Sequence, residues 1–321
     1  MKKAGWSSAL VAVVLLAGAV IAEAQQPTKI PRIGYVATTA PDTPNNLAFR
    51  RGLRDFGYIE GKNILVEDRY AEGKADRIPS LVAELVQLKV DILVSPVSAA
   101  IRAAKESTKT IPIVMVITDD PVATGLVDSL ARPGGNITGL TRLTQELNGK
   151  RLELLKEVLP TTSRVGVLSV AGFTVFKEYE PAAHALKVQL QPLEVRTPNP
   201  DLEGAFRNAL KAPVRALIAT RALVGYRKPI ADLAIKNGLP LMSEGSDFVA
   251  AGGVMSYAAN DPENYRRAAY YVDKILKGAK PADLPVEQPM KFEFIINLKA
   301  AKQIGLTIPP NVLVRADRVI R

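Results

Sequence analysis

Arg164-Val165-Gly166-Val167-Leu168-Ser169-Val170 decides the fold, because this stretch repeats an earlier strand. The first strand expected near the start of the chain reads Ile30-Pro31-Arg32-Ile33-Gly34-Tyr35-Val36-Ala37, with glycine again placed early among apolar residues. After each of the two, apolar runs of strand length alternate with segments of helical spacing. This alternation predicts parallel strands joined by right-handed helical crossovers. About ten strands are too many for one comfortable sheet, so the restart predicts two sheets.

The remaining elements follow from the same pattern. Helices are expected where a capping residue precedes proline, at Ser95-Pro96, Asp120-Pro121 and Asp261-Pro262. Further strands are expected at residues 63–69, 91–94, 111–117 and 137–140, and then at 190–196, 214–220, 239–242, 253–257 and 292–296.

The tail of the sequence sets the domain organisation. A helix at 261–279 and a strand at 292–296 come after the second set of elements is complete, so we expect the chain to return to the first lobe and cross again. The predicted fold is α/β, with two Rossmann-like lobes whose parallel sheets are joined by a hinge of three crossings. Lobe 1 takes residues 30–140 plus 261–279, and lobe 2 takes 141–259 plus 285–321. The crossings are expected near Thr141, Ala259 and Pro285.

The first 24 residues have the pattern of a secretory signal peptide. Lys2 and Lys3 precede an apolar stretch, Ala9–Ala22, and Ala22-Glu23-Ala24 is an A-x-A cleavage site. A membrane anchor is the alternative, but the stretch is shorter than the roughly 20 residues that span a bilayer. We expect cleavage after Ala24 and a mature chain in the periplasm. The sequence has no cysteine, which excludes a lipid-anchored mature N-terminus, disulfides and zinc-thiolate sites.

Charge and motifs narrow the function classes. The formal net charge is +10, and loss of two lysines and one glutamate with the signal peptide leaves +9. No basic run exceeds two residues, so we expect a solvated surface and no nucleic-acid partner. The single histidine, His184, cannot build a metal site, and no P-loop, G-x-S-x-G elbow or H-E-x-x-H motif is present. We therefore expect no metal, no cofactor and no enzymatic activity.

Candidate binding residues follow from the fold, because open parallel sheets bind ligands beyond the carboxyl ends of their strands. The residues at these positions are small hydroxyls, a few charges and two aromatics, which suit a small polar ligand with a ring or alkyl part. They are Thr38, Thr39, Ser95, Val97, Ser98, Ala99, Thr118, Asp119, Ser169, Phe173, Thr220, Arg221, Glu244 and Tyr257.

Three of these positions have alternative interpretations. The amides of Ser98 and Ala99 can receive an anion at a helix N-terminus, or Ser95 can simply cap that helix. Asp119 can contact a ligand ammonium group, or can pair with Glu244 as the acid and base of an exported hydrolase. Arg221 can bind a second negative group of the ligand, or can point to solvent or pair with an acid such as Glu244.

Several stretches together resemble a known family. They are Phe49-Arg50-Arg51-Gly52-Leu53-Arg54-Asp55-Phe56-Gly57-Tyr58, Leu130-Ala131-Arg132-Pro133-Gly134-Gly135-Asn136-Ile137-Thr138-Gly139-Leu140 with the preceding Asp120-Pro121-Val122, Gly149-Lys150-Arg151-Leu152-Glu153-Leu154-Leu155-Lys156-Glu157, and Phe294-Ile295-Ile296-Asn297-Leu298-Lys299. They resemble the ABC-transporter substrate-binding family whose better-known members bind tryptophan or tyrosine. The resemblance implies a type I periplasmic-binding fold with the ligand in the cleft between the lobes. The sequence departs from the family pattern at Ser169-Val170-Ala171-Gly172, Thr220-Arg221 and Ala258-Ala259, all at strand ends that face the expected cleft. The resemblance therefore implies a transport protein but does not identify its ligand.

The predicted function is that of a periplasmic receptor. It would close on a small ligand, an amino acid or related small carboxylate, possibly aromatic, and dock as a monomer on an ABC permease. The alternatives are a ligand-sensing receptor for a membrane sensor and, from another class, the exported two-lobe hydrolase.

Overall fold

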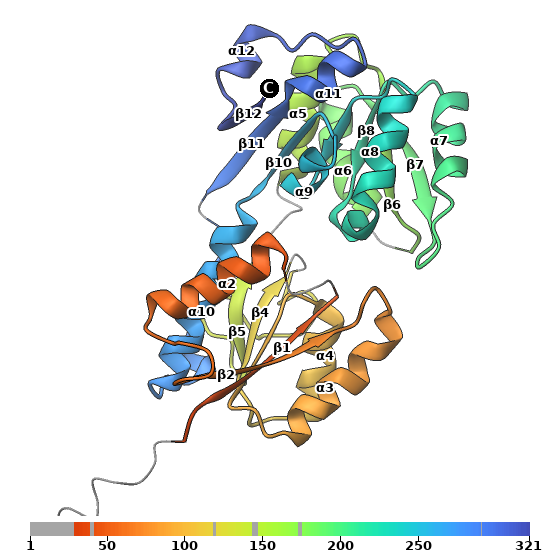
Figure 1. Ribbon diagram of the computed structural model, residues 1–321. Helices are drawn as coiled ribbons and strands as arrows, with labels where there is room; N and C mark the ends of the chain where they lie inside the picture. Colours follow the sequence, from red (N-terminus) through yellow and green to blue (C-terminus); the bar gives the residue numbers. More distant parts are fainter. Residues whose placement is uncertain (1–28, 39–41, 118–119, 143–146, 173–174, 290) are drawn as a thin grey trace, which may run out of the picture.

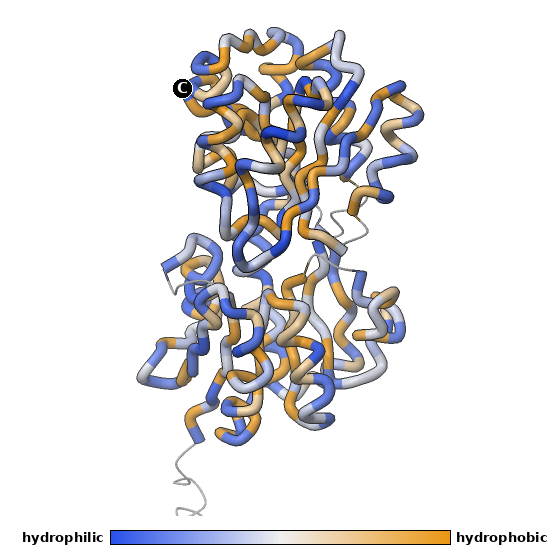
Figure 2. Tube along the Cα trace, turned by 90° about the vertical axis from the view of Figure 1, so that its right-hand side faces the viewer, coloured by the Kyte–Doolittle hydropathy of each residue, from blue (hydrophilic) through white to orange (hydrophobic). Residues whose placement is uncertain are grey.

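The computed structural model describes residues 29–38, 42–117, 120–142, 147–172, 175–289 and 291–321. These residues form two α/β lobes, one above the other in Figure 1 and in the turned view of Figure 2. Each lobe has its own sheet, as the repeated strand predicts. No helix among these residues has the length and apolar character needed to cross a membrane.

The sheet of the first lobe contains five parallel strands in the order β2-β1-β3-β4-β5. Their bounds are β1 (Arg32–Ala37), β2 (Leu65–Tyr70), β3 (Ile92–Ser95), β4 (Ile113–Ile117) and β5 (Ile137–Thr141). β3, β4 and β5 are buried along their whole length, as expected for parallel strands covered on both faces.

Two pairs of helices cover this sheet. α3 (Ile78–Gln87) and α4 (Ser98–Ser107) pack on one face, over Val36, Leu93 and Met115. α2 (Pro44–Asp55) and α10 (Asp261–Leu276) pack on the other face, over Tyr35, Val94 and Val116. Successive side chains of a strand point to opposite faces, so each strand serves both cores. α10 comes from late in the sequence and packs along α2.

The sheet of the second lobe contains seven strands in the order β12-β11-β10-β9-β8-β6-β7. They are β6 (Arg164–Val170), β7 (Gln189–Val195), β8 (Ala216–Ala219), β9 (Leu241–Ser243), β10 (Met255–Ala259), β11 (Phe292–Asn297) and β12 (Arg318–Ile320). One face carries α5 (Asn148–Val158), α6 (Val175–Ala185), α11 (Leu298–Gln303) and α12 (Pro310–Leu313). The other carries α7 (Leu202–Lys211), α8 (Arg227–Lys236), α9 (Ser246–Ala250) and the 3-10 turn η4 (Arg221–Tyr226).

The chain passes between the sheets three times. It leaves β5 for lobe 2, returns from β10 into α10, and crosses again from the segment before β11. That last segment lies beside β5, where the Thr141 amide donates to the Glu287 carbonyl at 3.0 Å. The three crossings therefore run close together.

Several details differ from the sequence-based expectations. β11 is antiparallel to β10, because the returning chain enters the second sheet from the end nearest the first lobe. Residues 121–125 after Asp120 form turns rather than a helix, although the Asp120 carboxylate accepts from the Val122 and Ala123 amides as a cap would. The N-cap of α10 is Asn260, not Asp261, whose carboxylate is engaged elsewhere.

Gly52 allows α2 and α10 to approach closely. A Cβ atom at this position would lie 2.5 Å from the Arg266 carbonyl oxygen and 2.8 Å from the Ala269 Cβ. Both distances are shorter than van der Waals contact, and one partner is backbone that cannot rotate away. The helices must therefore separate to admit any side chain here.

We expect Gly52→Ala to lower the free energy of unfolding by about 1–3 kcal/mol, because overpacking outweighs the gain in helix propensity. Gly149→Ala is the matched control, since its Cβ would meet only Ala182 at 3.7 Å. That control should be neutral or stabilising by up to about 1 kcal/mol. Urea unfolding of both variants measures the difference, and equal effects would contradict close packing at Gly52.

Candidate functional site

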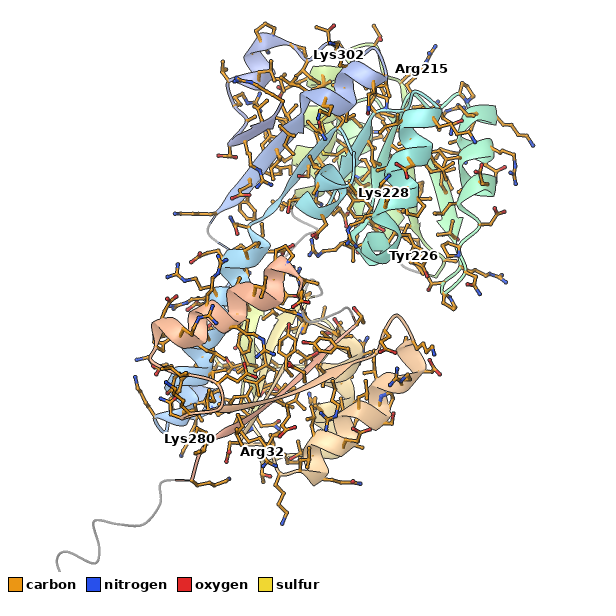
Figure 3. All side chains as sticks on the ribbon, in the orientation of Figure 1. Arg32, Arg215, Tyr226, Lys228, Lys280 and Lys302 are labelled. Atoms are coloured by element: carbon orange, nitrogen blue, oxygen red, sulfur yellow. The ribbon has the colours of Figure 1, made fainter. Side chains whose placement is uncertain are left out.

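The carboxyl ends of the parallel strands in each lobe face the other lobe. In Figure 3, Arg32 at the start of β1 and Arg215 just before β8 lie at opposite outer ends of the molecule. Tyr226, which follows β8, lies near the edge of lobe 2 that faces lobe 1. Because ligands bind beyond the carboxyl ends of open parallel sheets, the region between the lobes is the candidate site.

The structure places most of the predicted residues at this edge. Thr38 follows β1, Ser95 ends β3, Ser169 is the sixth residue of β6, Thr220 and Arg221 follow β8, Glu244 follows β9, Tyr257 lies in β10, and Val97, Ser98 and Ala99 begin α4. Ser95, Ser169, Thr220 and Glu244 are buried, whereas the other six are partly or largely exposed to solvent. Thr39, Thr118, Asp119 and Phe173 lie outside the described residues.

The N-terminus of α4 has no side-chain cap. The Ser95 hydroxyl donates to the Val36 carbonyl at 2.7 Å and accepts from the Val97 amide at 3.1 Å, so it joins β3 to β1. The N-cap residue is Val97, no acidic residue occupies the first turn, and Ala99 is exposed. The alternative that Ser95 caps the helix is therefore wrong. The first amides of α4 are the kind of group that binds anions.

Glu244 belongs to a buried network. One oxygen accepts from the Tyr179 hydroxyl at 2.8 Å and the other from the Arg221 amide at 2.9 Å. The Arg151 guanidinium, which is 0% exposed, lies 3.6 Å from the Glu244 carboxylate. Both carboxylate oxygens thus have partners, and Glu244 positions the start of η4 rather than facing solvent.

Arg151 extends this network toward β10. Its Nε donates to the Tyr257 carbonyl at 2.9 Å, and its Nη1 donates to the Asn148 Oδ1 at 2.7 Å. One guanidinium therefore contacts two neighbouring strands, the end of β9 through Glu244 and the middle of β10 through the Tyr257 carbonyl. A buried charge of this kind is tolerable only because it is paired and hydrogen-bonded.

A second charged cluster joins the two lobes. The Asp261 carboxylate accepts from Arg142 Nη1 at 3.0 Å through one oxygen and pairs with Arg221 Nη2 through the other. Arg142 follows β5, Arg221 follows β8, and Asp261 begins α10. Arg142 also donates to the Val116 carbonyl at 2.8 Å, and Asp247 lies 3.7 Å from Arg221. The partner of the Arg221 side chain is thus Asp261, not Glu244.

The sequence-based list lacks Arg142, Arg151 and Asp261. Arg151 had a detectable signal, because it lies four residues from both Leu147 and Leu155 on the apolar face of its helix. A charge on such a face indicates a buried partner. The sequence Asp261-Pro262 predicts a helix cap, and nothing in that pattern indicates that Asp261 pairs with two arginines. For Arg142 no sequence signal distinguishes it from a surface arginine.

Two hollows on the surface are formed by other residues. One of about 420 Å³ lies along α2 and α10, and one of about 660 Å³ is lined by residues such as Arg164 and Arg215 at the amino ends of the lobe 2 strands. Neither is lined by any of the predicted residues. Among the described residues, no group of three or more His, Asp or Glu side chains is placed to hold a metal ion.

Comparison with known proteins gives a family and a fold. Residues 45–320 match the family described as ABC transporter substrate binding protein. A tyrosine-binding protein of Clostridioides difficile (strain R20291) is 26% identical over 262 residues, which cover 80% of this chain and 75% of that protein.

Among solved structures, a conserved domain protein from Vibrio cholerae O1 biovar El Tor has a TM-score of 0.83 at 27% identity, covering 91% of this chain and 100% of the other. The ABC domain in complex with L-Trp from Streptococcus pneumonia has a TM-score of 0.80 at 24% identity, covering 90% of this chain and 100% of the other. Together with the two sheets, these likenesses confirm the two-lobe fold.

Replacing Arg151 should leave the Glu244 charge buried without its counter-ion. We expect Arg151→Met to lower the free energy of unfolding by about 3–5 kcal/mol. Lys150→Met, its neighbour on the same helix, breaks only an exposed pair with Glu153 and should cost at most about 1 kcal/mol. Urea unfolding distinguishes the two, and losses of similar size would contradict the role of Arg151.

The buried tyrosine of this network should make stability depend on alkaline pH. Burial, and then the Glu244 carboxylate, raise the pKa of the Tyr179 phenol well above its ordinary value. Its contribution is fully present below the unfolded-state pKa of about 10 and is lost as the pH rises toward the folded-state pKa. The free energy of unfolding should therefore fall above about pH 10, and less steeply in Tyr179→Phe. An unchanged slope in that variant, measured by urea unfolding from neutral to alkaline pH, would contradict this assignment.

Proposed function

Since the chain belongs to the ABC transporter substrate-binding protein family, we propose that it is the periplasmic solute receptor of an ABC importer. It closes its two lobes on an amino acid or related small carboxylate, with an aromatic side chain favoured. The observation that carries this proposal is the uncapped N-terminus of α4 at the edge where the strands of both lobes end. The tyrosine-binding relative and the tryptophan-bound neighbour support the choice of ligand class.

The proposed binding mode follows from the chemistry of that edge. The amides of Ser98 and Ala99 receive the ligand carboxylate, because a helix N-terminus carries partial positive charge. Asp119 contacts the ligand ammonium group. Tyr257, which lies 6.1 Å from Phe292 between ring centroids, and Phe173 supply aromatic surface. Thr38, Val97 and Arg221, which are partly exposed, line the same region, whereas the buried Ser95, Ser169, Thr220 and Glu244 support it from behind.

The same proposal covers the organisation of the mature protein. Cleavage after Ala24 releases a monomeric chain into the periplasm, where it docks on its permease. Lobe 1 takes residues 30–140 and 261–279, which the packing of α10 on α2 supports, and lobe 2 takes 141–259 and 285–321. Closure about a hinge couples the presence of ligand to a change of shape that a permease can recognise.

We further propose that the protein binds its ligand without chemical change. An exported hydrolase would use Asp119 and Glu244 as acid and base across the gap. Both Glu244 oxygens accept hydrogen bonds from the protein, which argues against that role.

Tryptophan capture provides a direct test of the ligand class. The only tryptophan, Trp6, lies within the signal peptide, so the mature protein should show tyrosine emission alone. Bound L-tryptophan should therefore report itself by a shift in its own emission, with calorimetry against L-tyrosine, other amino acids and aromatic acids alongside. Binding of a sugar or nucleoside, with no binding of any amino acid or carboxylate, would contradict the proposal.

The α4 amides can be tested by blocking them. Ala99→Phe should weaken binding by well over tenfold for whichever amino acid the calorimetric panel identifies as the ligand. The reason is that a bulky side chain obstructs approach to the helix N-terminus. Ser107→Phe at the other end of the same helix is the matched control and should bind as the wild type does. Calorimetry measures both, and full affinity in Ala99→Phe would mean that the ligand does not use these amides.

A further inference from the structure

Arg221 is the only cation in the predicted set of binding residues, and its environment is unusual. Its side chain is 14% exposed, at the carboxyl end of β8. Its amide is held by Glu244 at 2.9 Å, and its guanidinium lies over Gly245, where a Cβ atom would come within 2.5 Å of Nη1. The protein therefore fixes both the backbone and the side chain of Arg221.

The charges around Arg221 are balanced by the protein itself. Arg142 and Arg221 bring two positive charges, and Asp261 and Asp247 bring two negative charges. Burial lowers the pKa of Arg221, but Asp261 and then Asp247 raise it, with a net increase. The guanidinium stays charged, and its charge is already compensated. The other buried arginine of the region, Arg151, is matched by Glu244 in the same way.

This balance bears on which ligands can bind. A free arginine at a strand end attracts a second carboxylate of a ligand, because guanidinium and carboxylate form strong paired hydrogen bonds. An arginine already paired with two protein carboxylates attracts a further anion only weakly. The two carboxylates also repel that anion. A ligand without charge on its side chain meets no such penalty.

We propose that Asp261, together with Asp247, determines specificity by withholding Arg221 from the ligand. The receptor thereby selects amino acids with an uncharged side chain and rejects dicarboxylates. This inference rests on the proposed function, since it assumes that the ligand lies beside the end of β8. Asp261 acts through Arg221 and need not touch the ligand.

The test uses substitutions that should raise the affinity of the receptor for acidic ligands. Asp261→Asn and Asp247→Asn each remove one of the two compensating charges and should raise the affinity for L-glutamate and succinate about tenfold or more. Adding Arg221→Met to either variant should abolish the gain. Calorimetry with L-glutamate, succinate and L-tryptophan measures all variants. Asp232→Asn, which breaks an exposed pair with Lys228 in the same lobe, is the matched control for net charge and should gain nothing.

Two variants are needed because Asp261 is only 4% exposed and shared by two guanidinium groups, so Asp261→Asn can fail to fold. Asp247 is 31% exposed, and its replacement leaves Asp261 in place. No gain in Asp247→Asn would overturn the inference, as would an equal gain in Asp232→Asn or a gain that survives Arg221→Met.

The outcomes also separate this inference from the proposed function. If the wild type binds L-tryptophan or another amino acid but no variant gains affinity for acids, the proposed function stands and the inference falls. If the wild type binds no amino acid while Asp247→Asn gains succinate binding through Arg221, the masking of Arg221 by the two acids stands, and the selection of amino acids falls together with the proposed ligand class. Wild-type binding of L-glutamate as tight as that of L-tryptophan would contradict the inference directly.

Discussion

The arrangement of the two lobes depends on the ion pairs that the Asp261 carboxylate makes with Arg142 and Arg221. Asp261 begins α10 at the point where the chain leaves the second sheet, and it pairs with Arg142 from the end of β5 and Arg221 from the end of β8. Removing one partner would leave a charge buried without compensation, which is far more costly than never burying it. The ends of β5 and β8, which belong to different sheets, are therefore joined through the start of α10 at the hinge.

A second carboxylate performs the same role inside lobe 2. Glu244 joins the start of η4, Tyr179 of α6 and Arg151 of α5, and Arg151 reaches on to the Tyr257 carbonyl. Strand ends in parallel sheets leave polar backbone groups without ladder partners, and these must be satisfied when they are buried. Both networks meet this need with arginine, whose several donors reach different acceptors at once. The polar side chains near the strand ends thus have partners within the protein itself.

The fold could be predicted because its signals are local and repeated. Alternating apolar runs and helical spacings, with a glycine-containing strand that recurs at Arg164, are sufficient for two α/β lobes. The antiparallel β11 could not be predicted, since its direction depends on where the chain re-enters the sheet and not on its own residues. The position of site residues after strands followed from the fold. Their partners did not, because Asp261 and Arg142 meet only in three dimensions, and only Arg151 left a trace in the pattern of its helix.

The pairing of α2 with α10 has a consequence for how the chain acquires its structure. The Asp55–Arg266 ion pair joins residues 211 positions apart, and Gly52 makes room for the same distant helix. One face of the first sheet thus has only α2 to cover it until the last fifth of the polypeptide has been synthesised. Contacts of such long range slow folding, because a large loop must close before they form. The amino-terminal lobe, although it comes first along the chain, can be completed only near the end of translation.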